Sequence, residues 1–517
     1  MKTFLIQAII SLTTLAVADS LHQAHRLNHA HFHAHERRVP QGQYGQFSGG
    51  FPSSTSSIAS QAPTYTPPSG LLIPEVASVT FLGASTNNPS TQFVNETSPP
   101  CPSLPPSKLT PGMDPALTDS YPLSNGTGNH IVSPDSTLGK LQYAPHLSRD
   151  GGKGGVVNGA KVFLFCDTGT YSPPSGYGDG EFTGFVSGSA AVDIGDNAAS
   201  GTSLSLQDGV GAWSDNAARM RGLVPYTTGE LGYNNAMQGA DPISYRYAIW
   251  PESAIIPLNS THGLVYAPVV YDEVQRDTGN TTFTYTGATL LGISMPGDGG
   301  PVAERISNRI WQSWEVEWGT IGGARSWGSD GQGGNNGKVY LFGRTDGGLL
   351  LSRVDADKVS DRDSYEYWTE ASFWSSGMQA PDSTAFFITG NFMTADLVYS
   401  PYHKTFLLIY QDKYMDNTIY YRFLQAPAPL SSSAGASADL VENIVKYDWS
   451  EQEVLLKAPA PGEDAIYAGG PLVGYFDDDD LSEGGMKMLI TWTAPTGKTP
   501  GCPESQDQHE SAVVSWQ

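Results

Sequence analysis

Two aspartates follow strand-like segments early in the chain, in positions where a carboxylate needs an explanation. Asp167 comes directly after the apolar letters VFLFC, and Asp193 ends the segment SAAVD. A carboxylate beside a buried strand costs free energy unless it is hydrogen-bonded or used. Glycoside hydrolysis needs paired carboxylates, one protonated to assist the leaving oxygen and one ionised to activate water or attack the anomeric carbon. We therefore predict Asp167 and Asp193 as the catalytic pair. Glu252, in the segment WPES, is predicted as a third carboxylate that orients substrate or tunes a pKa.

Aromatic residues lie close in sequence to these acids, and aromatic rings bind the apolar faces of sugars. Four tryptophans are predicted as substrate-binding residues: Trp213, Trp250, Trp314 and Trp318. A structural alternative stays open for the acids. Asp167 and Asp193 lie near glycines, as turn-capping aspartates do, and Glu252 fits a solvated strand edge.

Five apolar segments recur along the chain, each followed by a turn and in most cases by a second strand-like segment. They begin at Lys161, His262, Lys338, Lys404 and Lys487. Continuous apolar runs are typical of strands buried on both faces, as in sheets that stack radially or pack in a sandwich. The repeats predict an all-β fold, a five-bladed β-propeller with long loops, and a two-domain β-sandwich is the alternative. Two segments receive local predictions: a hairpin turn at GGKGG (151–155) and a short helix at 302–311.

A propeller would bring the candidate acids together. Its central funnel is lined by the innermost strands, so carboxylates at the ends of those strands converge on one mouth. On this reasoning the apolar segment before Asp167 is an inner strand, and its carboxylate faces the funnel. Carboxyl groups of Asp167 and Asp193 within roughly 10 Å of each other would suit a hydrolase, whereas carboxyl groups on different faces would not.

Composition and charge exclude some partners and favour others. The chain has 517 residues, 28 Lys and Arg against 52 Asp and Glu, and a formal net charge of -24. Such a surface repels phosphate backbones and anionic membranes, so we expect no nucleic acid and no membrane as partner. Charged residues make up only 15% of the chain, whereas Gly (58) and Pro (36) are plentiful, which is typical of a β-rich secreted protein.

Three segments precede the predicted propeller domain at 71–517. Residues 1–18 have a signal-peptide pattern, with Lys2, an apolar stretch and a small-residue cleavage site. Residues 19–38 hold six of the eleven histidines and end in a dibasic pair, and they fit a disordered propeptide better than a metal-binding tract. Residues 39–70 are rich in Gln, Ser and Pro and predict a flexible linker. We expect a secreted protein, extracellular or in the cell wall.

Cysteines and sequons fit export. Cys101 and Cys502 are predicted to pair and join the two ends of the domain, and Cys166 to be a buried free thiol, although three cysteines do not fix the connectivity. Four N-x-S/T sequons predict glycosylation at Asn95, Asn125, Asn259 and Asn280. The sequence has no zinc-protease, nucleophile-elbow or dinucleotide-binding motif. We expect no cofactor, although a structural calcium would be compatible with the funnel.

The segments VFLFCDTGTY and GFVSGSAAVDIGD together resemble the start of the family catalogued as domain of unknown function 4185. The segments WPES, VYAPVVYD, VEWGTIGG and DLVYSPYHKTFLLIY are similar to its secreted fungal members, and the resemblance covers most of residues 140–517. It implies a five-bladed β-propeller related to furanose-cleaving glycoside hydrolases, with endo-acting D-arabinanases among the bacterial members. It also implies that Asp167 matches the aspartate of a Gly-Asp-Thr motif and Asp193 the second acid. Cys166 replaces the usual glycine and leaves the substrate open.

These features predict a secreted glycoside hydrolase, endo-arabinanase-like, that acts on a furanose-containing polysaccharide through paired carboxylates. Two alternatives remain: a carbohydrate-binding propeller without catalysis, and a structural protein of the cell wall or surface. Because fold is a weaker argument for function than the site itself, the geometry around the acids has to decide between them.

Overall fold

The fold is given by a computed structural model. It describes residues 73–84, 141–142, 147–171, 182–193, 204, 206–209, 222–237, 244–275, 280–296, 300–326, 337–400, 402–413, 416–428, 430, 440–458, 466–476, 487–495 and 507–516. The predicted signal peptide, His-rich segment and linker, together with Cys101 and Cys502, lie outside the described residues. In the part of the chain that the structure describes, no helix is long and apolar enough to cross a membrane.

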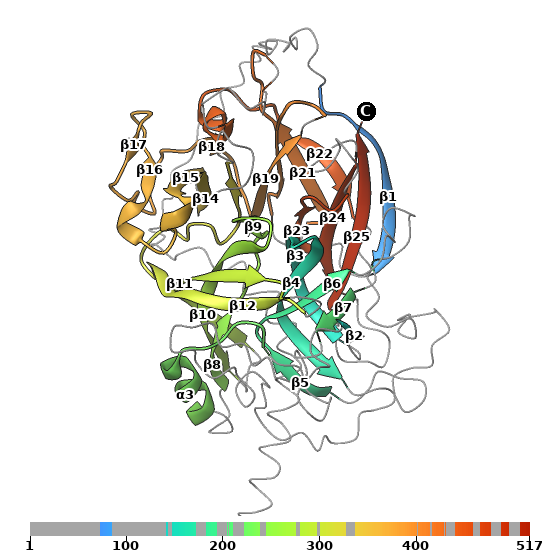
Figure 1. The fold of residues 1–517 in the computed structure, drawn as a ribbon, viewed down its shortest axis with the longest axis vertical. Coiled ribbons are helices and arrows are strands. Elements are labelled where there is room, and N and C mark those ends of the chain that lie inside the picture. Colours follow the sequence, from blue (N-terminus) through green and yellow to red (C-terminus); the bar gives the residue numbers. More distant parts are fainter. Residues whose placement is uncertain are drawn as a thin grey trace, which may run out of the picture.

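Five antiparallel sheets, numbered as blades 1 to 5 in chain order, make up the described fold (Figure 1). Blade 1 holds β2 (Leu141–Gln142), β3 (Leu147–Val157), β4 (Ala160–Tyr171), β5 (Phe182–Val186), β6 (Ser189–Asp193) and β7 (Leu206–Gly209). Blade 2 holds β8 (Ser244–Ile249), β9 (Ile256–Pro257), β10 (His262–Gln275), β11 (Asn280–Ser294) and β12 (Val302–Gln312). Helix α3 (Thr228–Met237) lies between these blades in the sequence.

The other three blades follow the same plan. Blade 3 holds β13 (Gly323–Arg325), β14 (Lys338–Thr345), β15 (Gly348–Asp355), β16 (Glu366–Trp368), β17 (Trp374–Ser375) and β18 (Ile388–Thr389), with the short 3-10 helices η3 (Ala356–Lys358) and η4 (Arg362–Ser364) in between. Blade 4 holds β19 (Thr394–Ser400), β20 (Thr405–Gln411), β21 (Thr418–Phe423) and β22 (Glu453–Lys457), with η5 (Leu440–Val445). Blade 5 holds β23 (Tyr467–Leu472), β24 (Lys487–Pro495), β25 (Asp507–Trp516) and β1 (Val76–Ala84).

The innermost strands of the five blades form a ring around one axis. Each contacts the next: β3 with β9, β9 with β13, β13 with β19, β19 with β23, and β23 with β3. Figure 1 shows β3, β9, β19 and β23 toward the centre of the view. Strand β1, near the start of the described chain, pairs with β25 near its end and is the outermost strand of blade 5. This pairing joins the two ends of the chain in one blade and so closes the ring of blades. The predicted five-bladed β-propeller is confirmed.

The five apolar segments seen in the sequence are the second strands of the blades, and not the innermost ones. They form β4, β10, β14, β20 and β24. A second strand has a paired strand on either side and a neighbouring blade on either face, so it is apolar throughout; every residue of β20 is buried. The innermost strands face the axis and have small or polar residues, as in GAR of β13 and YAGGPL of β23.

The predicted hairpin turn at GGKGG is wrong, because these residues lie inside the innermost strand β3. A Cβ on Gly154 would lie 1.8 Å from the carbonyl oxygen of Val162, so only glycine allows the two strands to approach this closely. The turn comes later, at Asn158 and Gly159, whose φ angles of 52° and 75° suit a tight hairpin.

The predicted helix at 302–311 is also wrong, because the segment forms strand β12, paired with β11. Its Arg305 and Arg309 both form ion pairs with the buried carboxylate of Glu230 on α3, at 2.5 and 2.7 Å. Pairing with a neighbouring strand and these long-range ion pairs override the local helical pattern. The prediction for Cys166 is confirmed, since within the described residues it is buried and forms no disulfide.

Candidate functional site

One pocket collects residues from all five blades and therefore lies on the propeller axis. The blades contribute Asp150, Glu252, Arg344, Thr394 and Tyr467, in that order. Pockets that collect a few polar groups at the meeting point of several elements are the usual places for ligands. This axial pocket is the candidate functional site.

Asp150 enters the pocket from a distorted part of β3. Arg149 pairs with Thr168 of β4 and Gly151 with Phe165, so a single residue, Asp150, stands opposite two on β4. Such a bulge re-aims a side chain and is common beside functional sites. The backbone next to Asp150 is held by β24, because Gly151 N–H donates to Thr493 Oγ1 at 2.9 Å and Thr493 Oγ1 donates to the Gly151 carbonyl at 2.6 Å. These bonds hold the backbone beside Asp150, and Asp150 itself is only 3% exposed.

Glu252 enters the pocket from blade 2, in the segment between β8 and β9. Its N–H donates to the carbonyl of Trp250 at 2.8 Å, which makes a tight turn just after the fully buried Trp250. Glu252 is partly exposed and lines the same pocket as Asp150. The innermost strands β3 and β9 of their blades are in contact. Two carboxylates from adjacent blades thus share one pocket.

The wall of the pocket on blade 5 is held in place by the buried Gln411. Its Oε1 accepts from Gly469 N–H at 2.7 Å, its Nε2 donates to the Ile466 carbonyl at 3.3 Å, and Thr394 Oγ1 donates to the Gly469 carbonyl at 2.8 Å. These bonds fix Ala468 in a left-handed conformation with φ of 55°, which is rare for a residue other than glycine. The pocket is therefore a rigid structure.

A buried ion pair joins two innermost strands close to the pocket residues. Lys153 Nζ donates to Asp396 Oδ2 at 2.6 Å across the axis, with side chains 0% and 3% exposed. Lys153, Asp396 and Gly470 lie on innermost strands. Each comes two residues after a residue that lines the pocket. A Cβ on Gly470 would lie 2.5 Å from Asp396 Oδ2, so the ion pair fills the axis at this level. Burial raises the pKa of Asp396, and the charge and hydrogen bond of Lys153 offset this only in part.

Asp167 lies outside the axial pocket and connects blade 1 to blade 2. Its Oδ1 accepts from Trp250 Nε1 at 2.9 Å and its Oδ2 accepts from Arg246 at 3.0 Å. Arg246 also donates to Asp272 at 3.1 Å and to Ser187 at 2.9 Å. The carboxylate is 8% exposed and is part of a network at the interface of two blades.

Asp193 lies at the other end of β4 from Asp167. It pairs with Lys161 in the strand register, which places it six residues away along β4, roughly 20 Å at about 3.3 Å per residue. It accepts a hydrogen bond from the Tyr475 hydroxyl at 2.5 Å. The structure does not bring Asp167 and Asp193 together, so the predicted pair cannot act on one bond, because glycosidase carboxylates lie at most about 10 Å apart. The prediction treated β4 and β6, the second and third strands of blade 1, as innermost strands.

Of the predicted sugar-binding tryptophans, the three that the structure describes do not line the axial pocket. Trp250 and Trp318 are fully buried, so they have no free face for a sugar, and each packs against another aromatic ring, Phe283 and Tyr367 respectively. Trp314 is 72% exposed, but it lies in the turn after β12 and is not among the pocket residues. Trp213 lies outside the described residues.

The predicted glycosylation sites are only partly described. Asn259 lies in the β9–β10 hairpin, where its Oδ1 accepts from the N–H of Thr261 and of His262 at 2.9 Å. Asn280 begins β11, and Asn95 and Asn125 lie outside the described residues. Glycosylation stays a prediction at all four positions. Within the described residues, no group of three or more His, Cys, Asp or Glu is placed to hold a metal ion.

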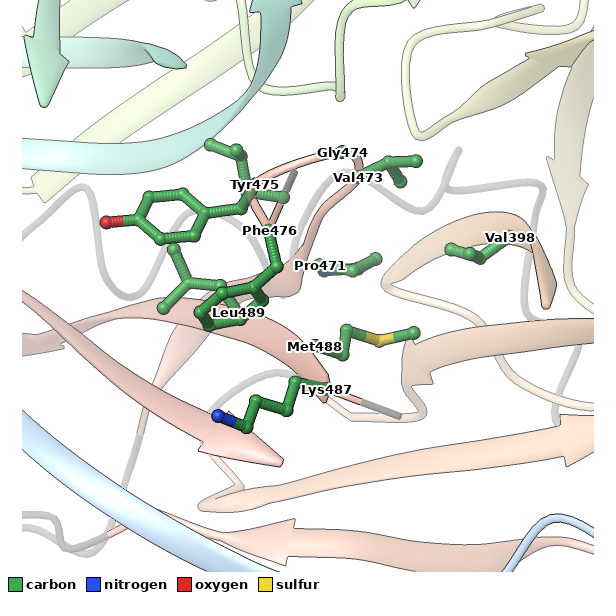
Figure 2. A pocket seen from close by; sticks show the side chains of 10 residues that line it. Val398, Pro471, Val473, Gly474, Tyr475, Phe476, Lys487, Met488 and Leu489 are labelled. Carbon is green, nitrogen blue, oxygen red and sulfur yellow. The ribbon is translucent and has the colours of Figure 1, made fainter. Parts of the chain in front are cut away.

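A second and smaller pocket lies between blades 4 and 5 (Figure 2). Its lining is mostly apolar, with Val398, Leu472 and Met488 among its residues, and Lys487 is its one charged residue. Tyr475 lines it too, and the hydroxyl of this residue is bonded to Asp193. Without a carboxylate in its lining, this pocket offers no acid or base for hydrolysis.

The acid missed in the sequence is Asp150, in the segment SRDGG. The signal that predicts it is the Asn158-Gly159 turn directly before the apolar segment of β4. An Asn-Gly turn flanked by strand-like residues predicts that the preceding residues pair with the following ones. Residues 147–157 would then be a strand next to β4, with Asp150 across from Cys166 and Asp167.

The sequence matches no protein-family model and no curated protein. Among solved structures, it is similar to the subtype N11 neuraminidase-like protein of A/flat-faced bat/Peru/033/2010 (H18N11), with 10% identity and a TM-score of 0.30 over 74% of this chain and 91% of that chain. It is also similar to α-L-arabinofuranosidases from Podospora anserina, with 13% identity and a TM-score of 0.22, and from Coprinopsis cinerea, with 12% identity and a TM-score of 0.24. Each covers 50% of this chain, and the alignments cover 88% and 89% of those chains. TM-scores this low carry no argument, so the propeller assignment rests on the sheet order alone, and the resemblance to the domain of unknown function 4185 stays a prediction.

Proposed function

We propose that the protein is a secreted glycoside hydrolase that acts on a furanose-containing, arabinan-like polysaccharide. The observation that carries the proposal is the sharing of one axial pocket by Asp150 and Glu252, from adjacent blades. Hydrolysis of a glycosidic bond needs two carboxyl groups on either side of the bond. The shared pocket supports Asp150 and Glu252 as that pair, whereas Asp167 and Asp193 lie at opposite ends of β4. The furanose substrate is taken from the sequence resemblance, and secretion from the pattern of residues 1–18.

The chemistry divides between the two acids. One carboxyl protonates the oxygen of the leaving sugar, and the other, ionised, activates water or attacks the anomeric carbon. The buried ion pair of Lys153 and Asp396 lies two residues further along the innermost strands, and we place the substrate on the side of the pocket where the acids lie. The backbone around Asp150 is held by hydrogen bonds, which limits how far its carboxylate can move during the reaction. A catalytic group that is already positioned lowers the entropic cost of reaching the transition state.

The test is sugar release from a panel of arabinans, arabinogalactans, fructans and xylans. Asp150→Asn and Glu252→Gln are each expected to lower kcat/KM on the responsive polymer by roughly 10²–10⁴-fold, as for loss of a general acid or base. Asp167→Asn serves as the matched control, because it removes an aspartate one strand away that does not line the pocket. Activity that survives in both Asp150→Asn and Glu252→Gln would overturn the assignment.

The roles of the two acids separate on substrates with different leaving groups. Nitrophenyl glycosides need little protonation of the leaving oxygen, so loss of the general acid is expected to spare them, whereas loss of the base or nucleophile affects both substrate types. The carboxamide variant that keeps nitrophenyl glycoside hydrolysis but loses polymer hydrolysis marks the general acid.

A carbohydrate-binding propeller without catalysis is the second candidate. It is favoured by the one failure of the catalytic prediction, the separation of Asp167 from Asp193. In that case glycan binding would persist when Asp150 and Glu252 are both replaced, and no polymer would release sugar.

A further inference from the structure

The axial pocket contains two cationic side chains that the chemistry of hydrolysis does not require. Arg344, on β14 of blade 3, and Lys413, two residues after the end of β20 of blade 4, both line it. Within the described residues, neither has a carboxylate oxygen within 4 Å. Other arginines of the same blades do have acidic partners, such as Arg353, which pairs with Glu366 at 2.8 Å and also with Glu442.

Arg344 is held in place without being neutralised. Its guanidinium donates to the Met393 carbonyl at 3.4 Å and approaches the Met393 sulfur at 4.0 Å, and both are long contacts with uncharged groups. A guanidinium has five N–H donors, so most of them remain for a ligand. Arg344 is partly buried whereas Lys413 is exposed, so water screens the charge of Arg344 less.

The charges in the pocket are divided by blade. The acids Asp150 and Glu252 come from blades 1 and 2, and the cations Arg344 and Lys413 come from blades 3 and 4. The contacts among the innermost strands place blades 1 and 2 side by side and blades 3 and 4 side by side around the axis. One side of the pocket is therefore acidic and the opposite side basic.

From this division we infer that the axial pocket binds a sugar that carries an anionic group, a carboxylate as in a uronic acid or a phosphate. The anionic group lies against Arg344 and Lys413, and the glycosidic bond lies toward Asp150 and Glu252. Guanidinium groups bind carboxylates and phosphates through paired hydrogen bonds, and charge-assisted bonds are about twice as strong as neutral ones. The part of this inference that concerns the bond to be cleaved rests on the proposed function, and the part that concerns binding does not.

The net charge of -24 works against an anionic ligand at long range, so recognition has to be local. At physiological ionic strength, exposed charges more than about 8 Å away are largely screened. Contacts with a partly buried Arg344 are screened less, because less water separates the charges. Binding of the anionic sugar is therefore expected to change little between 0.15 and 0.5 M salt, in contrast to binding through exposed lysines alone.

The experiment compares sugars that differ only in the anionic group: D-galactose, D-galacturonate and D-galactose 6-phosphate. Calorimetric titration of the full chain is expected to show at least about tenfold tighter binding of one anionic sugar, equivalent to about 1.4 kcal/mol. The two anionic sugars distinguish carboxylate from phosphate recognition. Equal affinity for all three sugars would overturn the inference.

Substitutions of the cationic residues test whether the preference for an anionic sugar arises in the axial pocket. Arg344→Gln is expected to abolish the preference, Arg344→Lys to retain part of it because the charge stays but the paired donors are lost, and Lys413→Gln to reduce it two- to threefold. Lys457→Gln is the matched control, because it removes the same charge from an exposed position on β22 of blade 4. A preference that survives in Arg344→Gln would show that the anion binds elsewhere.

The test of anionic-sugar binding can succeed or fail independently of the test of the proposed hydrolase function. An Asp150-dependent hydrolysis of neutral arabinan, without any preference for anionic sugars, would overturn this inference and leave the hydrolase proposal in place. Arg344-dependent binding of an anionic sugar, with no polymer hydrolysed, would support the inference for binding and overturn the hydrolase proposal.

Discussion

Asp150 and Asp167 lie on neighbouring strands of one blade, but their side chains have different surroundings. The bulge in blade 1 places Asp150 directly across from Cys166 and Asp167. Asp150 faces the axial pocket from the innermost strand. Asp167, on the second strand, is bonded to Arg246 and Trp250 at the interface with blade 2.

The difference shows what each position in a blade permits. A second strand is paired on both edges and covered on both faces, so a charge there has to be neutralised by the protein itself. An innermost strand has one edge toward the axis, so a charge there can line the axial pocket, as Asp150 does, unless it is paired within the protein, as Lys153 and Asp396 are. An aspartate at the end of the most apolar segment is therefore more readily explained by structure than by catalysis.

The largest expected effect on stability comes from the buried ion pair of Lys153 and Asp396. Lys153→Met leaves Asp396 buried without its cation, which is expected to cost about 3–5 kcal/mol of unfolding free energy, measured by denaturant titration. The double variant Lys153→Met with Asp396→Leu is the control and is expected to recover most of the loss, since no buried charge is left unpaired. A single variant within about 1 kcal/mol of wild type would contradict the buried pair.

The comparison between the two aspartates is tested directly by Asp167→Asn. The variant loses charge-assisted hydrogen bonds from Arg246 and Trp250, so unfolding is expected to become easier by about 2–3 kcal/mol. Its kcat/KM at a temperature where it stays folded is expected to remain within about threefold of wild type, in contrast to Asp150→Asn. A stable but inactive Asp167→Asn would return Asp167 to the catalytic machinery.

Acid is expected to destabilise the fold through two buried histidines. Burial lowers the pKa of His509 to about 3 and that of His403 to about 4, below the ordinary value of 6.5. The unfolded chain therefore binds protons below pH 6.5 that the folded chain does not, and stability falls as the pH drops from 6.5 toward the folded pKa values. The expected loss is about 2 kcal/mol per histidine at pH 5.

The measurement is the unfolding free energy at pH 7, 6 and 5. His509→Gln is expected to be less stable at pH 7, because the ring packs against Phe163 and Phe165, but to have a pH slope smaller by about 1.4 kcal/mol per unit. An unchanged slope in this variant would show that His509 does not remain neutral in the fold.

The smallest effect is expected at the start of helix α3, away from the pocket. Thr227 and Glu230 cap the helix reciprocally, since Glu230 N–H donates to Thr227 Oγ1 at 3.2 Å and Thr227 N–H to Glu230 Oε2 at 2.9 Å. Thr227→Ala is expected to cost about 1 kcal/mol of unfolding free energy without any change in activity. Thr228→Ala, at an exposed position one residue later, is the matched control, and an equal loss there would argue against the cap.

The positive charges near Glu230 stabilise its ionised form more than burial destabilises that form. Burial raises the pKa of Glu230, but hydrogen bonds and charges of Arg305 and Arg309, with the Thr227 N–H, lower it to about 2. Its stabilising contribution is therefore fully present above the ordinary pKa of 4.5 and is lost as the pH falls toward 2.

The propeller and its five blades were predictable from sequence, because burial on both faces makes each second strand apolar along its length. The segments of β4, β10, β14, β20 and β24 have this property whatever their neighbours are. The same reasoning misplaced the acids. It treated the most apolar strands as innermost, whereas innermost strands have short, small and polar segments that resemble loops, as GGKGG does.

The amino-acid sequence by itself determined the five apolar second strands and the number of blades, because these depend on a local pattern of apolar residues. Only the tertiary structure decided which charges meet. Lys153 reaches Asp396 from a position 243 residues away, and Asp150 shares a pocket with Glu252 through contact between two blades. Such pairings depend on a bulge one residue long and on the closure of the ring, and neither leaves a periodic signal in the chain.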